Sequence, residues 1–135
     1  MLSKIFKAEV SDLTHIRKFI QDFLIEKKIK EDLQYQVILA IGEATMNIVQ
    51  HAYKGGDALK KIKVNVDLID ETLIFDFLDE GIKADPSKIK PRKLEEIRPG
   101  GLGTHFIKMV MDDIQWGEPS ENWVNHLILK KKFKY

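Results

Sequence analysis

Cysteine is absent from the 135 residues of this chain, which excludes disulfide bonds and thiol catalysis. Long apolar runs are also absent, and the first residues lack the apolar core and cleavage site of a secretory signal. These absences predict a cytoplasmic protein without a membrane association. Charge of one sign is not in excess, because 22 basic and 21 acidic residues give a net charge of +1. We therefore expect no direct binding to nucleic acid.

Proline is scarce, and three of the four prolines fall in one charged stretch without periodicity: Pro86, Pro91 and Pro99. Such a stretch predicts a long mobile segment, and we interpret residues 82–101 as a lid. The chain as a whole is 44% hydrophobic and 32% charged, a composition typical of globular proteins. Its length is common for one domain, so a single domain over residues 1–135 is expected.

Hydrophobic periodicity predicts an order of helices and strands that suits a two-layer fold. The expected elements are a strand at 4–10, helices at 14–28 and 32–53, strands at 61–69 and 72–78, a helix ending near 111, and strands at 114–116 and 123–132. The helices must share one side of the sheet, which predicts a two-layer α/β (α+β) sandwich with a mixed, mostly antiparallel sheet and helices on one face. Asp32 is the expected N-cap of the second helix, and the lysines at 130–134 are expected on a solvated edge strand.

A glycine-rich stretch, Gly100–Gly103, leads into the third helix. Glycine lets the backbone approach an anion closely, and the N–H groups of Gly103, Thr104 and His105 at the helix start have no partner within the helix. The helix dipole favours negative charge at that end. The stretch therefore indicates a phosphate-binding site, with a flexible loop capped by a helix as the alternative.

The second helix carries a polar stripe. Glu43, Asn47 and Gln50 follow at spacings of four and three, while a different face is apolar and contains Val37, Ile41, Ala44, Ile48 and Ala52. An acid and an amide on one stripe suit magnesium chemistry, because Asn47 can supply an oxygen ligand and Glu43 can accept a proton. The alternative is a stripe that faces solvent. His51 is better explained as a packing or capping residue than as a metal ligand, since no second histidine has ligand spacing.

Asp79 lies where the strand at 72–78 ends and a loop opens, in the sequence Asp79-Glu80-Gly81. Its carboxylate could accept a hydrogen bond from an amino group such as that of adenine, and Gly81 would let the ring approach the backbone. An ordinary turn is the alternative.

Together, these fragments resemble the nucleotide-binding boxes of the ATPase superfamily that includes gyrase, the Hsp90 chaperones, histidine kinases and MutL. The matching boxes are Glu43–Tyr53, Asp79–Gly81 and Gly101–Thr104. The short chain and the sequences Ile41-Gly42-Glu43-Ala44 and His51-Ala52-Tyr53 are most similar to the bacterial anti-sigma factors that are also serine protein kinases. The resemblance covers roughly residues 10–130, and it implies the Bergerat ATP-binding fold.

The resemblance also implies roles for individual residues. Glu43 matches the catalytic base, Asn47 the magnesium ligand, and Asp79 the acid that contacts adenine. The nucleotide-binding residues implied in this way are Asn47, His51, Asp79, Gly81, Arg98, Gly101, Leu102, Gly103 and Thr104. Among them, Arg98 occupies a lid position from which its guanidinium could reach the terminal phosphate. ATP with Mg²⁺ is the expected ligand.

The function implied is an ATP-dependent serine/threonine protein kinase that acts in partner switching. Such a protein binds a sigma factor or an analogous target, and phosphorylates an anti-anti-sigma (STAS-type) antagonist; a homodimer is expected. The alternative is a nucleotide-dependent binding module without kinase activity. Two departures from the family pattern stand out: Ile82-Lys83-Ala84-Asp85 follows Gly81 in place of a further glycine, and Asn122–Leu127 replaces the usual glycine-threonine turn.

Overall fold

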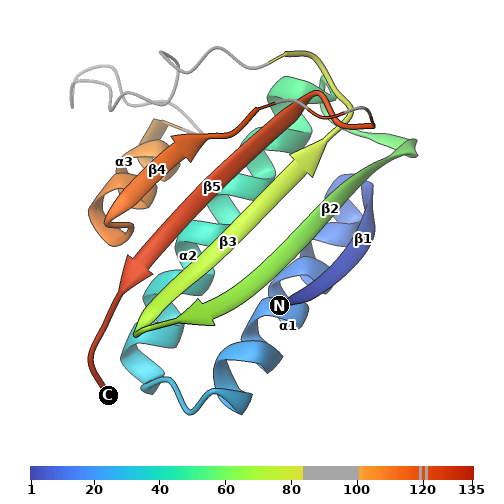
Figure 1. Cartoon of the computed structure of the whole chain (residues 1–135). Coiled ribbons are helices and arrows are strands. Elements are labelled where there is room, and N and C mark those ends of the chain that lie inside the picture. Colours follow the sequence, from blue (N-terminus) through green and yellow to red (C-terminus); the bar gives the residue numbers. More distant parts are fainter. Residues whose placement is uncertain (84–100, 119, 121) are drawn as a thin grey trace.

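One antiparallel sheet and a single layer of helices make up the part of the chain that the structure describes (Figure 1). The computed structural model describes residues 1–83, 101–118, 120 and 122–135. The elements are β1 (Leu2–Ala8), a 3₁₀ turn η1 (Val10–Asp12), α1 (Leu13–Glu26), α2 (Glu31–Asn47), a π-helical turn η2 (Ile48–Ala52), β2 (Asp57–Ile69), β3 (Thr72–Asp79), α3 (Gly101–Val110), β4 (Asp113–Trp116) and β5 (Asn125–Lys132). The strand order is β1-β2-β3-β5-β4, and each pairing is antiparallel. The expected two-layer sandwich with helices on one face is confirmed.

The hairpin of β2 and β3 forms the centre of the sheet. Its residues alternate between the two faces, as the period of two predicts, and the inward-facing side chains Ile62, Val64, Val66, Leu73, Phe75 and Phe77 are fully buried. Asp70 and Glu71 both have positive φ, at 48° and 61°, which suits the tight two-residue turn of a hairpin. The turn sets a register in which Val66 faces Phe75.

The helices cover the inner face of the sheet with the apolar stripes that the sequence predicts. On α1 the buried side chains are Leu13, Ile16, Ile20, Phe23 and Leu24, and the expected face of α2 and η2, namely Val37, Ile41, Ala44, Ile48 and Ala52, is buried as well. Burying each large apolar side chain stabilises the fold by about 1.5–3 kcal/mol. This packing places α2 across the inner face of the sheet (Figure 1). No helix in the described ranges is long and apolar enough to span a membrane.

Two local predictions are wrong. Asp32 is not the N-cap of α2, because the helix begins at Glu31 after Lys30, and the Asp32 carboxylate accepts a hydrogen bond from the neighbouring Leu33 N–H at 2.8 Å. The lysines near the C-terminus are not on an edge strand, since β5 lies between β3 and β4 and Lys130 faces a residue of each. No helix covers the outer face of the sheet in Figure 1, so the side chains of Lys130 and Lys132, which alternate onto that face, can lie along it with their amines in solvent. The predicted lid falls largely on residues 84–100, outside the described residues.

Candidate functional site

Glu43 and Asn47 lie one turn apart at the end of α2. Both side chains are half-buried, and within the described ranges neither makes a hydrogen bond or an ion pair. Their separation of four residues places them on one side of the helix. The pair therefore presents a carboxylate and an amide that remain available to a ligand. Gln50, the third residue of the expected stripe, lies beyond α2 in the π turn η2, and its side chain is exposed.

The end of η2 is in direct contact with the loop that follows β3. The Ile82 N–H donates to the Ala52 carbonyl at 2.8 Å. A Cβ atom on Gly81 would lie only 2.4 Å from the same carbonyl oxygen and 2.7 Å from the Ala52 Cβ. Glycine is required at position 81 because the loop packs against this backbone, a reason that the sequence did not reveal.

Tyr53, just beyond η2, links the same two segments through its hydroxyl. The hydroxyl accepts a hydrogen bond from the Glu80 N–H at 2.6 Å and donates one to the Lys61 carbonyl at 2.7 Å. Burial raises the pKa of the Tyr53 hydroxyl above its usual value, so it stays protonated and able to donate. Sequence reasoning assigned Tyr53 no separate role, although a buried tyrosine normally has a partner for its hydroxyl.

Replacing Tyr53 with phenylalanine is expected to lower the free energy of unfolding by about 1–3 kcal/mol, because the Glu80 N–H and the Lys61 carbonyl lose their partner. Urea unfolding should give a lower midpoint with an unchanged slope. The matched control is Y35F on α2, whose side chain is 68% exposed. Equal stability of Y53F and Y35F would contradict the linking role of Tyr53.

Asp79 is the last residue of β3 and only 3% of it is exposed. Its Oδ1 accepts hydrogen bonds from the Gly81 N–H at 2.9 Å and from the Asn125 amide at 2.8 Å. Burial raises the pKa of Asp79 above its usual value, while these two hydrogen bonds act in the opposite direction. Sequence reasoning missed Asn125, although its alternation with Leu127 and Leu129 along β5 places all three on the inner face of the sheet.

The last of the three boxes, Gly101–Thr104, forms the first turn of α3. The helix begins at Gly101, two residues earlier than its expected start. It packs against α2, and its Ile107 is buried. The predicted phosphate contacts of Leu102, Gly103 and Thr104 stay predictions, because their side chains are not among the described ones. Arg98 lies outside the described residues. His51 is exposed, so it does not pack in the core, and its place among the nucleotide-binding residues stays a prediction.

The side chains of Asn47 and Glu43 fit a magnesium ion that is also bound by phosphate. Within the described ranges, no group of three or more histidine, aspartate or glutamate side chains could hold a metal. Mg²⁺ commonly keeps several waters and binds through one or two protein oxygens together with substrate phosphates. The unpartnered amide of Asn47 next to Glu43 suits that kind of site.

Solved structures define the class of fold. The chain is similar to a structure of the SiaB–SiaC complex from Pseudomonas aeruginosa, with a TM-score of 0.67 and 14% identity over 98% of this chain and 89% of that one. It is also similar to the catalytic domain of the histidine kinase ThkA, with a TM-score of 0.55 and 16% identity over 98% of this chain and 96% of that one. The fold is that of an ATPase catalytic domain of the histidine kinase type.

The chain belongs to the histidine kinase-like ATPase domain family, whose sequence profile matches residues 6–130. Among curated proteins it is similar to the serine-protein kinase RsbW of Bacillus cereus strain G9842, with 35% identity over 57% of this chain and 52% of the relative. The RsbW of Bacillus anthracis strain CDC 684 is 37% identical over the same shares. The chain thus spans about half the length of the curated relatives that it matches. The expected resemblance to this family of kinases is confirmed.

Proposed function

We propose that this chain is a partner-switching regulator that binds ATP with Mg²⁺ and phosphorylates a serine or threonine of a small anti-anti-sigma antagonist. In the same cycle it binds a sigma factor or an analogous target, and a cytoplasmic location is part of the proposal. The supporting observation is the unpartnered pair Glu43 and Asn47 on a helix that packs against α3 and ends against the Asp79 loop. The names of the RsbW relatives point to the same activity.

In this proposal Asp79 accepts a hydrogen bond from the amino group of the base, and the first turn of α3 binds the phosphates with its N–H groups. Arg98, in the predicted lid, binds the terminal phosphate through its guanidinium. Asn47 supplies a ligand oxygen to Mg²⁺, and the ion neutralises phosphate charge when it is bound. Glu43 takes the proton of the attacking hydroxyl. A bond then forms between that hydroxyl oxygen and the γ-phosphorus, the bond from the γ-phosphorus to the β-γ bridging oxygen breaks, and ADP leaves.

Phosphorylation of the antagonist would add about two negative charges at its contact with this chain. Repulsion and the cost of burying that charge would release the antagonist. The regulator would then be free to bind its target. Transfer of radiolabel from γ-labelled ATP to a purified antagonist tests the kinase activity directly, because a binding module without that activity transfers none.

Replacing Asn47 with alanine is expected to remove the magnesium dependence of ATP binding, since the variant lacks the proposed protein ligand to the ion. Titration calorimetry with ATP, with and without Mg²⁺, measures the effect. The wild-type protein should bind at least about tenfold more tightly with Mg²⁺, and N47A should bind equally in both conditions. The exposed Gln50 provides the control variant Q50A. Wild-type binding that is equally tight without metal would contradict the role of Asn47.

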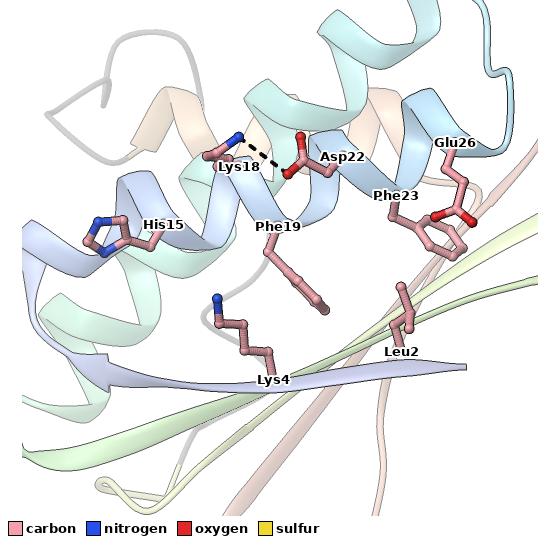
Figure 2. Close-up of a pocket in the computed structure, with 8 residues that line it drawn as sticks. All are labelled: Leu2, Lys4, His15, Lys18, Phe19, Asp22, Phe23 and Glu26. Atoms are coloured by element: carbon pink, nitrogen blue, oxygen red, sulfur yellow. Dashed lines mark hydrogen bonds and ion pairs between the residues drawn. The ribbon is translucent and has the colours of Figure 1, made fainter.

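The expected homodimer belongs to the same proposal. A groove of about 360 Å³ lies between β1 and α1, where Phe19, Phe23 and Leu2 point toward one another (Figure 2). Its lining is completed by Lys4, His15, Lys18, Asp22 and Glu26. In the described part of the chain, β1 pairs only with β2, so its outer edge can accept another strand. Side chains of both charge signs suit a self-complementary contact with a second copy.

A further inference from the structure

Two of the buried polar side chains face each other at one end of the sheet. Among the described residues, the buried polar side chains are Thr45, Asp79 and Asn125. Thr45 bonds to the Ile41 carbonyl of its own helix at 2.9 Å. Asp79 and Asn125 are direct partners in the register of β3 and β5. They stand at one end of the sheet, in line with the buried apolar residues of these two strands. A polar pair at this position needs a reason, because burial of polar groups costs free energy unless they are paired.

The side-chain amide of Asn125 uses both of its N–H groups at this end of the sheet. It donates to Asp79 Oδ1 at 2.8 Å and to the Ile82 carbonyl at 2.8 Å. The backbone N–H of Val124 donates to the Asp79 carbonyl at 2.7 Å. Both the backbone and the carboxylate of Asp79 are therefore held by the start of β5.

The bond to Ile82 extends this arrangement to the loop. The Ile82 N–H is bonded to the Ala52 carbonyl of η2, and the Ile82 carbonyl is bonded to Asn125. Residue 82 is thus fixed between the helix layer and β5. The same asparagine orients the acid and anchors the loop that leaves it.

We propose that Asn125 is a positioning residue that holds Asp79 as an oriented hydrogen-bond acceptor and thereby makes the site select a base with an exocyclic amino group. The inference rests on the proposed binding of ATP. A base with an oxo group at the same ring position would bring an acceptor against the carboxylate, and two acceptors repel. The hydrogen bond that Asn125 donates to Oδ1 also lowers the pKa of Asp79, and so acts against the increase that burial causes.

Binding of Mg·ATP and of Mg·ITP, in which an oxo group replaces the amino group, tests the inference. For Asn125→Leu, we expect ATP affinity to fall by about tenfold or more while ITP affinity changes little, so that the preference for ATP shrinks. The pH profile should change as well. ATP binding is lost as the pH falls through the pKa of Asp79, and removing the donor raises that pKa, so the loss should occur at higher pH in the variant.

Two further variants keep the result interpretable. Asn125→Asp preserves the shape of the side chain but places a second carboxyl group against Asp79, and it should also reduce the preference for ATP if the leucine variant does not fold. The control is His126→Gln. His126 is the next residue on β5, and its side chain bonds to Asp76 at 2.8 Å, away from Asp79. This variant should keep the wild-type preference for ATP.

The outcomes separate the two proposals. A folded Asn125 variant that keeps the wild-type ATP preference and pH profile would overturn the inference alone, and so would an equal loss of ATP and ITP binding. A wild-type protein that binds neither nucleotide would overturn the proposed function and this inference with it. A selective loss of ATP preference with a shifted pH profile would support both.

Discussion

Replacing Glu43 with alanine is expected to abolish phosphate transfer from ATP to the antagonist while ATP binding persists. Glu43 is half-buried and makes no hydrogen bond or ion pair within the described ranges, so its removal leaves no buried partner unpaired. General-base catalysis typically contributes a factor of about 10²–10⁴, and we expect a loss of transfer rate of at least that size. Single-turnover transfer of radiolabel, measured beside ATP affinity by calorimetry, separates chemistry from binding.

A second variant of Glu43 and a control variant test this interpretation. E43Q keeps the shape of the side chain but cannot take the proton, so it should be as inactive as E43A. Glu31 lies exposed in the first turn of the same helix, and E31A should transfer phosphate at the wild-type rate. Transfer that survives in both Glu43 variants would show that this carboxylate is not the base.

Replacing Gly81 with alanine is expected to have the largest effect on the structure of the site. The new Cβ would lie 2.4 Å from the carbonyl oxygen and 2.7 Å from the carbonyl carbon of Ala52, and backbone atoms cannot yield as a flexible side chain can. The loop must move away from η2, which breaks the bond from Ile82 to Ala52. We expect a loss of about 1–3 kcal/mol in the free energy of unfolding. ATP affinity should also fall, because Asp79 loses its bond from the Gly81 N–H.

Gly42 gives the matched control. It lies within α2, and a Cβ there would meet the Arg17 side chain at an ordinary 3.6 Å. Alanine in a helix interior is more stable than glycine by about 0.5–1 kcal/mol, so G42A should stabilise the protein. Urea unfolding of both variants measures the difference. G81A as stable as the wild-type protein would contradict the tight contact between the loop and η2.

Periodicity in the sequence predicted most of the fold because each element buries one face. The alternation through Val64 and Val66 and the helical spacing of Ile16 and Ile20 are local patterns that record which side meets the core. The position of the lysine-rich strand was not predictable in this way. Whether a strand has neighbours on both sides depends on how distant segments pair, and Lys130 acquires one neighbour from β3 and another from β4.

In the candidate site as well, the sequence predicted features within one element but not the contacts between elements. The spacing of Glu43 and Asn47 predicted their shared side because both lie within one regular helix. Gln50 lies in η2, a π turn that the spacing did not predict, and hydrogen bonds reach this turn from residues outside it: the Gly55 N–H bonds to the Val49 carbonyl and the Ile82 N–H to the Ala52 carbonyl. Such contacts are not encoded in the helical pattern itself.

The sequence by itself determined the class of fold, the apolar faces of the helices and strands, and the residue types at the three boxes. Only the tertiary structure decided how these boxes are joined. Tyr53 bonds to Glu80, which is 27 positions away, and Asn125 bonds to Asp79 across 46 positions. The physical reason is that a hydrogen bond or a close backbone contact depends on where two segments meet in space, whereas a periodic pattern records only which side of one segment is buried.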